Sequence, residues 1–145
     1  MSKKNGGQGG DVIVMCSIAG LLAEPLFPIY SATKSATLMY VRALVGDPNH
    51  ASTGVRVNCI TPTAVDTPLL NLTPERVSKG NFDLAIAMRS EHVIAPPKNV
   101  AHAVFKLLSD PEERQGCAVM VTEKGYRIDA YDVNFGRSFR ALQAT

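Results

Sequence analysis

The chain has 145 residues, of which 46% are hydrophobic and 19% are charged, and its formal net charge at pH 7 is +2. This composition is ordinary for a globular domain, and the small net charge indicates no special partner. The only basic pair near the N-terminus, Lys3 and Lys4, is too short for a nucleic-acid arm, so nucleic-acid binding is not expected. No apolar run approaches the roughly 18 residues of a membrane span, and the first residues lack the apolar core of a signal peptide. We therefore expect a cytoplasmic protein without a membrane span.

The cysteines and histidines do not suggest a metal site. Cys16, Cys59 and Cys117 are odd in number and widely spaced, and each falls in or beside a predicted strand, which favours buried free thiols. There is no Cys-x-x-Cys pair, and the three histidines have no metal-ligand spacing relative to one another. No bound metal is predicted.

Strand-like and helical patterns alternate along the chain. Strands are predicted over residues 11–16, 55–60 and 117–122, and helices over residues 30–46 and 97–109. The continuous apolar run of the first strand is typical of a strand buried on both faces of a parallel sheet. Strands separated by helices indicate parallel βαβ units, and therefore an α/β fold.

The two predicted helices differ in their apolar pattern. Residues 30–46 are apolar almost all round, which suggests burial on two sides, and Pro48 cannot continue this helix. In the second helix the apolar residues form one stripe, made by Val100, Ala103, Val104, Leu107 and Leu108. Its other residues, Lys98, Asn99, His102 and Lys106, are then predicted to face water. His102 is thus expected to be a solvated surface residue and not a catalytic one.

Three hydroxyl or amine side chains are predicted to meet near the end of the first strand. Tyr30 and Lys34 are four residues apart, which places them on one helical face with Cβ atoms about 5 to 6 Å apart. A neighbouring ammonium favours the phenolate, the form of tyrosine that can act as a general base. Ser17 follows the carboxyl end of the first strand, where ligands bind in open α/β sheets, and its hydroxyl can hold a substrate oxygen. The alternative is a surface tyrosine beside a solvated lysine.

The chain resembles the short-chain dehydrogenase/reductase family, and within it the subgroup of 15-hydroxyprostaglandin dehydrogenases. The resemblance is carried by three segments, which are Met15-Cys16-Ser17-Ile18-Ala19-Gly20, Tyr30-Ser31-Ala32-Thr33-Lys34 and Arg56-Val57-Asn58-Cys59-Ile60-Thr61-Pro62. It implies a partial Rossmann-like, doubly wound parallel sheet, in which residues 1–124 form the C-terminal half of a dehydrogenase domain. Residues 125–145 are expected to be a weak helix or a disordered extension. The N-terminal cofactor-binding half of the family fold is expected to be absent, because the glycine-rich residues 6–10 precede a strand instead of following one.

The resemblance also implies the roles of individual residues. Ser17, Tyr30 and Lys34 are the expected catalytic residues. Tyr30 and Lys34 are also expected to touch the ribose of an NAD cofactor, with NADP not excluded. The nicotinamide is expected against the segment that follows the second strand, at Pro62, Val65 and Thr67. The family usually has glycine where this chain has Thr63, and relatives that oxidise prostaglandins have glutamine where it has Phe27.

The substrate is predicted from the apolar residues of a long connection, and the assembly from the resemblance. The long connection over residues 68–96 carries apolar residues that either form a binding wall for a lipid-like alcohol or ketone, or cap the core, and these are Leu69, Leu70, Leu72, Phe82, Leu84, Ile86 and Met88. Asn58 is expected to be structural, hydrogen-bonding neighbouring loops. Helix 30–46 is expected to mediate a homodimer or larger oligomer.

Two functions remain open from the sequence. The chain is either the catalytic half of an NAD(P)-dependent alcohol dehydrogenase or ketone reductase, or an inactive short form that pairs with a full-length relative and regulates it.

Overall fold

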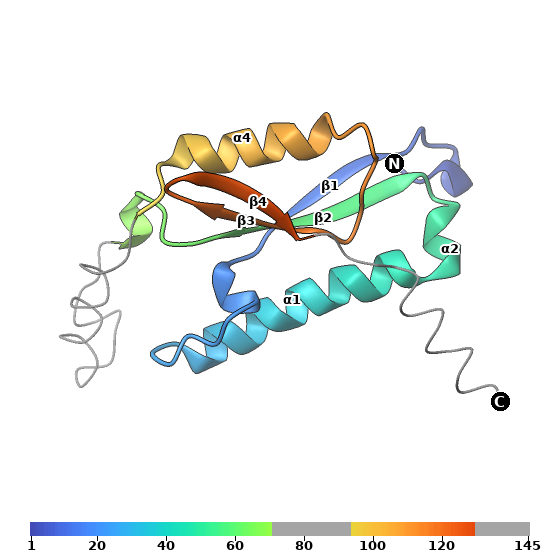
Figure 1. Cartoon of the computed structure of the whole chain (residues 1–145). Helices are drawn as coiled ribbons and strands as arrows, with labels where there is room; N and C mark the ends of the chain where they lie inside the picture. Colours follow the sequence, from blue (N-terminus) through green and yellow to red (C-terminus); the bar gives the residue numbers. More distant parts are fainter. Residues whose placement is uncertain (71–93, 130–145) are drawn as a thin grey trace.

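The computed structural model describes residues 1–70 and 94–129, in which strands and helices alternate (Figure 1). The larger elements, in chain order, are β1 (Gly10–Met15), α1 (Pro28–Gly46), β2 (Val55–Pro62), α4 (Pro97–Leu108), β3 (Ala118–Thr122) and β4 (Gly125–Asp129). The shorter ones are η1 (Lys3–Asn5), η2 (Ile18–Gly20), α2 (Pro48–Ala51) and η3 (Pro68–Leu70). The predicted α1, β2, α4 and β3 are thus confirmed to within two residues at each end.

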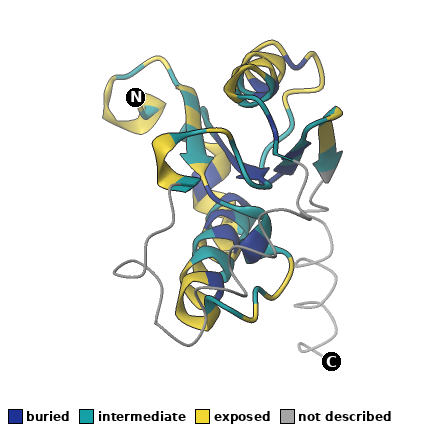
Figure 2. Cartoon of the chain, turned by 90° about the vertical axis from the view of Figure 1, so that its left-hand side faces the viewer, coloured by how far each residue is buried: buried dark blue, intermediate teal, exposed yellow. Residues whose placement is uncertain are grey.

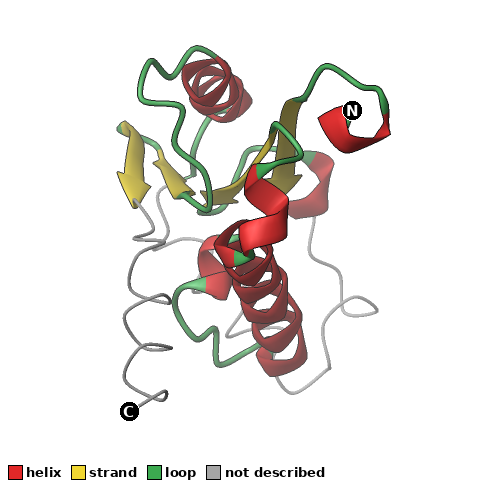
Figure 3. Ribbon diagram, turned by 90° about the vertical axis from the view of Figure 1, so that its right-hand side faces the viewer, coloured by secondary structure: helices red, strands yellow, loops and turns green. Residues whose placement is uncertain are grey.

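The described strands form one open sheet in the order β1-β2-β3-β4. β1 pairs in parallel with β2, and β2 pairs in parallel with β3. Helix α1 covers one face of this sheet and α4 covers the other (Figure 3). The expected Rossmann-like α/β fold is therefore confirmed.

Strand β4 corrects the expectation for the segment after residue 124. Residues 125–129 pair antiparallel with β3, so they form neither a weak helix nor a disordered extension. Gly125 has a φ of +133°, a value that residues with side chains rarely adopt, and it follows the two-residue turn Glu123–Lys124 that reverses the chain. Only Ile128 of this short edge strand packs against a core cluster, so its apolar signal in the sequence is weak. The rest of the predicted extension, residues 130–145, lies outside the described residues.

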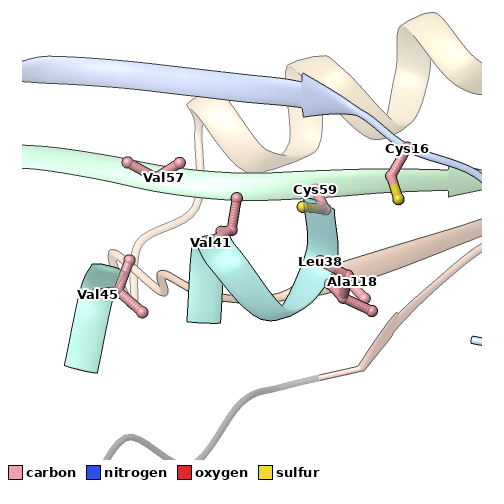
Figure 4. Close-up of a cluster of buried hydrophobic side chains, with 7 residues drawn as sticks. All are labelled: Cys16, Leu38, Val41, Val45, Val57, Cys59 and Ala118. Carbon is pink, nitrogen blue, oxygen red and sulfur yellow. The ribbon is translucent and has the colours of Figure 1, made fainter. Parts of the chain in front are cut away.

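Two core clusters fill the spaces between the sheet and its helices. The cluster under α1 consists of Cys16, Leu38, Val41, Val45, Val57, Cys59 and Ala118 (Figure 4). The cluster under α4 consists of Ile60, Ala103, Leu107, Val119 and Val121. Successive residues of β2 serve opposite clusters because strand side chains alternate between the two faces.

The helices bury narrower stripes than their sequences suggest. The inner face of α1 is buried at Leu38, Val41 and Val45, whereas Met39 is 50% exposed. Figure 2 shows that buried and exposed residues alternate along this helix. On α4, the prediction was wrong for Leu108, which is 46% exposed. Leu108 lies about 100° around the helix from buried Leu107, beyond the edge of the stripe that contacts the sheet.

Two asparagines tie loops to the sheet. Asn58 is buried; its Oδ1 accepts from the backbone N–H of Cys117 at 3.0 Å, and its Nδ2 donates to the carbonyl of Arg114 at 3.0 Å. The expected structural role of Asn58 is confirmed. Asn99 was expected to face water, but its Nδ2 donates to the carbonyls of Thr122 and Glu123, which holds the β3–β4 turn against α4.

The three cysteines are buried free thiols, as predicted. Burial, together with neighbouring Cys16, raises the pKa of Cys59 to about 11, although Arg42 acts in the opposite direction. Cys59 is therefore protonated at neutral pH and acts as an apolar core side chain. No helix within the described ranges is both long and apolar enough to cross a membrane.

Candidate active site

The carboxyl ends of β1, β2 and β3 meet at one edge of the sheet, because these strands run parallel. Ser17 lies just past the end of β1, and the segment with Thr63 and Thr67 lies just past the end of β2. Ligands bind at this edge in open α/β sheets.

Ser17 is held in an extended conformation with φ −164° and ψ 157°. Its Oγ accepts from the backbone N–H of Ala19 at 3.2 Å, so the side chain caps the short helix η2. A hydroxyl oxygen that accepts one hydrogen bond still has its own hydrogen to donate. Ser17 can therefore donate to a ligand oxygen in the space beyond β1.

Tyr30 and Lys34 lie on the first turns of α1, which begins at Pro28 with the preset φ that suits a first helical position. The Nζ of Lys34 is 5.5 Å from the centroid of the Tyr30 ring, so the predicted pairing on one helical face is present. The same Nζ donates to the carbonyl of Met15 at 3.3 Å. Lys34 therefore links α1 to the end of β1, beside Ser17.

A close contact between η2 and α1 fixes the spacing between Ser17 and Lys34. A Cβ on Gly20 would lie 3.0 Å from the carbonyl oxygen of Lys34 and 3.1 Å from the Sγ of Cys16. The Sγ of Cys16 donates to the same carbonyl at 3.3 Å, and the Oγ of Ser35 donates to the carbonyl of Gly20 at 3.2 Å. Only glycine at position 20 leaves room for this approach.

The segment after β2 forms the facing wall. Thr63 uses both its backbone N–H, at 2.9 Å, and its Oγ1, at 3.2 Å, to donate to the carbonyl of Val121. The Oγ1 of Thr67 donates to the carbonyl of Val65 at 3.3 Å, and Val65 forms a parallel bridge with Ala95. This wall is thus attached to β3 on one side and to the start of α4 on the other.

These walls enclose a groove of about 1060 Å³. All the residues predicted for the site line it, namely Ser17, Tyr30, Lys34, Pro62, Val65 and Thr67. Phe27, Leu69 and Leu70 line it too, whereas the rest of the predicted apolar wall lies in residues 71–93, outside the described residues. His102 is exposed on α4 and does not line the groove, as expected.

Sequence reasoning missed several lining residues. Glu24 belongs to the connection between η2 and α1, and Pro97, Val100 and Ala101 belong to the first turns of α4. The position of Glu24 between Ser17 and Tyr30 in the sequence was a signal for the first. The contribution of α4 depends on the crossover back to β3, which no local pattern marks. Within the residues described, no group of three His, Cys, Asp or Glu side chains is placed to hold a metal ion.

Sequence comparisons relate this chain to a known family. The sequence model described as short chain dehydrogenase matches residues 1–77, just over half of the 145 residues. The 15-hydroxyprostaglandin dehydrogenase [NAD(+)] of Mus musculus is 31% identical over 138 residues, which are 92% of this chain and 51% of the relative. The human enzyme of the same name is 31% identical over 136 residues, 91% of this chain and 51% of the relative. The chain thus spans about half the length of the curated relatives that it matches.

Two solved structures share the fold. A 7 alpha-hydroxysteroid dehydrogenase complexed with NADH and 7-oxo glycochenodeoxycholic acid has a TM-score of 0.63 at 24% identity, over 86% of this chain and 46% of that chain. A short chain dehydrogenase from Mycobacterium paratuberculosis bound to NAD has a TM-score of 0.59 at 26% identity, over 82% of this chain and 46% of that chain. From the family match, the shared fold and the groove at the carboxyl edge of the sheet, we conclude that this chain belongs to the short-chain dehydrogenase family.

Proposed function

We propose that the chain carries the catalytic centre of an NAD(P)-dependent dehydrogenase or reductase that interconverts a secondary alcohol and a ketone. The supporting observation is that Ser17, Tyr30 and Lys34 line one groove at the carboxyl edge of the sheet. Tyr30 is 43% exposed, so its phenol oxygen can reach a ligand that enters from solvent. The names of the relatives and of the solved structures favour NAD over NADP.

The proposed chemistry assigns one task to each of the three side chains. In the oxidation direction, Ser17 donates a hydrogen bond to the substrate oxygen, and Tyr30, as the phenolate, accepts the hydroxyl proton. Lys34 lies beside the Tyr30 ring and stabilises the phenolate by its charge. The O–H bond and the C–H bond of the alcohol break, the second with its electron pair as hydride, and a carbonyl forms. A bound nicotinamide supplies the acceptor of this hydride.

The groove offers suitable groups for the nicotinamide and its ribose. Lys34 uses one of its three N–H groups on Met15, which leaves two for ribose hydroxyls. Pro62, Val65 and Thr67 form a wall that can hold the nicotinamide ring and its carboxamide. Thr63 stands where the family usually has glycine, and its hydroxyl is directed towards Val121 by a hydrogen bond. The residues that are present therefore fit this half of the cofactor.

Replacing Tyr30 with phenylalanine tests the proposal. The change removes one hydroxyl, and we expect it to lower turnover of a secondary alcohol by about 10²- to 10⁴-fold, the usual contribution of a general base. NADH absorbance would be followed in the 145-residue protein and in a fusion with the segment of the mouse relative that has no counterpart here. His102→Ala is the matched control, because His102 is exposed and does not line the groove. Near-normal turnover by Tyr30→Phe in a preparation whose parent is active would refute Tyr30 as the base.

A different observation favours the second function, an inactive form that pairs with a full-length relative. The outer face of α1 is exposed and apolar at Ala32, Ala36, Met39 and Ala43. An apolar hollow of about 450 Å³ lies beside edge strand β1, lined in part by Val12, Val14 and Leu44. The free edge of β1 pairs with no strand in residues 1–70 and 94–129. An exposed apolar surface next to such an edge is typical of an association site, which also supports our proposal of a dimer through α1.

Association through α1 is tested by introducing a charge on its outer face. We expect Met39→Lys to abolish co-purification of the chain with itself or with a full-length relative. Phe105→Lys, at the exposed position on α4, should leave co-purification intact. Equal loss in both variants would contradict association through α1. We also propose a cytoplasmic location, supported by the buried free thiols of Cys16, Cys59 and Cys117.

A further inference from the structure

The groove has one charged lining residue that the proposed chemistry does not use. Among its described lining residues, most of which are apolar, there is one cation, Lys34, and one carboxylate, Glu24. Lys34 is engaged with the carbonyl of Met15 and lies beside the Tyr30 ring. Glu24 contacts neither of these groups by a hydrogen bond or an ion pair.

Glu24 is held in place mainly through its backbone. Its N–H donates to the Oγ of Ser31 on α1 at 3.0 Å, and its carbonyl accepts from the N–H of Phe27 at 3.0 Å. Its Oε1 accepts from the N–H of Leu26 at a long 3.4 Å. Glu24 is half-buried and forms no ion pair within residues 1–70 and 94–129. Glu24 thus lines the groove, and its charge is not compensated by any described side chain.

A carboxylate among these lining residues acts on any charged group that enters the groove. Apolar walls reduce the screening by water, so a carboxylate on the ligand is repelled and a cation is attracted. Partial exposure of Glu24 limits the effect to a few-fold in affinity, as for other exposed ion pairs.

We propose that Glu24 is a specificity-determining residue, which makes the groove favour alcohols or ketones with a cationic group away from the reacting carbon and disfavour those with a carboxylate there. This inference rests on the proposed function only in taking an alcohol or ketone as the ligand class. It concerns which molecules bind, and it does not depend on Tyr30 acting as a base.

Three 1-phenylethanols with a para substituent test the proposal, because they share one apolar body. The substituents are aminomethyl, which is cationic, carboxamide, which is neutral, and carboxylate. Binding to the 145-residue protein would be measured by ligand-observed NMR at low and at high ionic strength. At low ionic strength we expect the aminomethyl alcohol to bind about three- to tenfold more tightly than the carboxylate alcohol, with the carboxamide between them. High salt should narrow this ratio.

Two variants separate a local effect of Glu24 from a change in net charge. Glu24→Gln should bring the three affinities within about twofold of one another, because it removes the charge and keeps the shape. Glu113→Gln makes the same change of net charge at the opposite edge of the sheet and should leave the ratio unchanged. An unchanged ratio in Glu24→Gln, tighter binding of the carboxylate alcohol to the parent protein, or no binding of any of the three would each overturn the proposal. Absence of hydride transfer would count against the proposed function but not against these binding ratios.

Discussion

The two edges of the sheet use polar side chains in opposite ways. At the amino edge, buried Asn58 and Asp110 hydrogen-bond the backbone of residues 112–117, the loop that leads into β3. At the carboxyl edge, Ser17, Tyr30 and Lys34 border an open groove and keep hydrogen-bonding capacity that the described residues do not use. Removing a buried paired group costs stability. We therefore expect substitutions at the amino edge to lower stability, and substitutions of groove residues at the carboxyl edge to lower binding or turnover.

At the amino edge, the buried carboxyl group of Asp110 is an example of a polar group that is fully used inside the fold. Burial favours the neutral form of its carboxyl group, but hydrogen bonds from the backbone N–H groups of Arg114 and Glu112 outweigh it, together with the charges of Arg114 and Arg56. The pKa of Asp110 is therefore lower than its ordinary value. Its two oxygens accept from Arg114 at 3.0 Å and from Glu112 at 3.4 Å, which closes the loop after α4.

At the carboxyl edge, a large effect comparable to that of Tyr30→Phe is expected from Ser17→Ala. If Ser17 donates to the substrate oxygen as we propose, loss of its hydroxyl should lower turnover by about 10²-fold or more, as for other hydrogen-bond donors in active sites. The same change removes the cap of η2, which should lower the free energy of unfolding by only about 1 kcal/mol. Steady-state kinetics and denaturant unfolding of the same preparation check the two effects. Unfolding of the variant at neutral pH would mean that the carboxyl edge also carries the fold.

At the amino edge, Asn58→Ala should have the reverse profile. The N–H of Cys117 and the carbonyl of Arg114 would lose their partners, at about 1 to 3 kcal/mol for each buried group. We expect a loss of roughly 2 to 6 kcal/mol in the free energy of unfolding, measured with denaturant, with ligand binding by the folded fraction unchanged. The matched control is Asn49→Ala, because Asn49 is exposed on α2 and should tolerate the change within about 0.5 kcal/mol. Equal losses of stability in Asn58→Ala and Asn49→Ala would contradict a special stabilising role of the buried polar groups at the amino edge.

Two glycine substitutions test whether the close contact between η2 and α1 is needed at the carboxyl edge. Gly20→Ala inserts a Cβ at 3.0 Å from the carbonyl oxygen of Lys34 and should cost about 1 to 3 kcal/mol of unfolding free energy while displacing Ser17 from Lys34. Gly46→Ala places its Cβ in open space at the end of α1 and should be neutral or stabilising by up to about 1 kcal/mol. Thermal unfolding of both variants gives the comparison. Equal stability of the two would show that η2 can move away from α1 without cost.

The smallest effect is the pH dependence from Asp110. A carboxyl group whose pKa is lowered by folding stabilises the folded state above its ordinary pKa, about 3.9, and this contribution disappears as the pH falls through the folded value. Asp110→Asn should lower stability at neutral pH, and the difference from the parent protein should shrink below about pH 4. Urea unfolding between neutral and acidic pH measures this difference. A difference that is constant with pH would contradict the lowered pKa.

Local sequence pattern predicted the parts of the fold that depend on neighbouring residues. The one-sided stripe of α4 and the pairing of Tyr30 with Lys34 follow from the period of the helix, which the order of residues fixes by itself. The apolar run of the first strand predicted the strand β1, but the expected burial on both faces was wrong: Val12 is 37% exposed and Met15 is 51% exposed. β1 lies at the edge of the described sheet, where fewer described residues cover it. The short strand β4 could not be predicted in this way. It has one partly buried apolar side chain, Ile128, and it is held by hydrogen bonds to β3 that the sequence does not display.

Some features of the candidate site were predicted from the sequence, and others appeared only in the tertiary structure. The sequence identified Ser17, Tyr30, Lys34, Pro62, Val65 and Thr67 as residues of the site, but their meeting in one groove depends on parallel pairing of β1 with β2 and on the Gly20 contact between η2 and α1. The tertiary structure alone added Glu24 and the first turns of α4 to the walls. Chemistry that depends on residue type and local spacing is readable from the chain. The shape and charge of a groove depend on segments that are distant in sequence, and only folding brings them side by side.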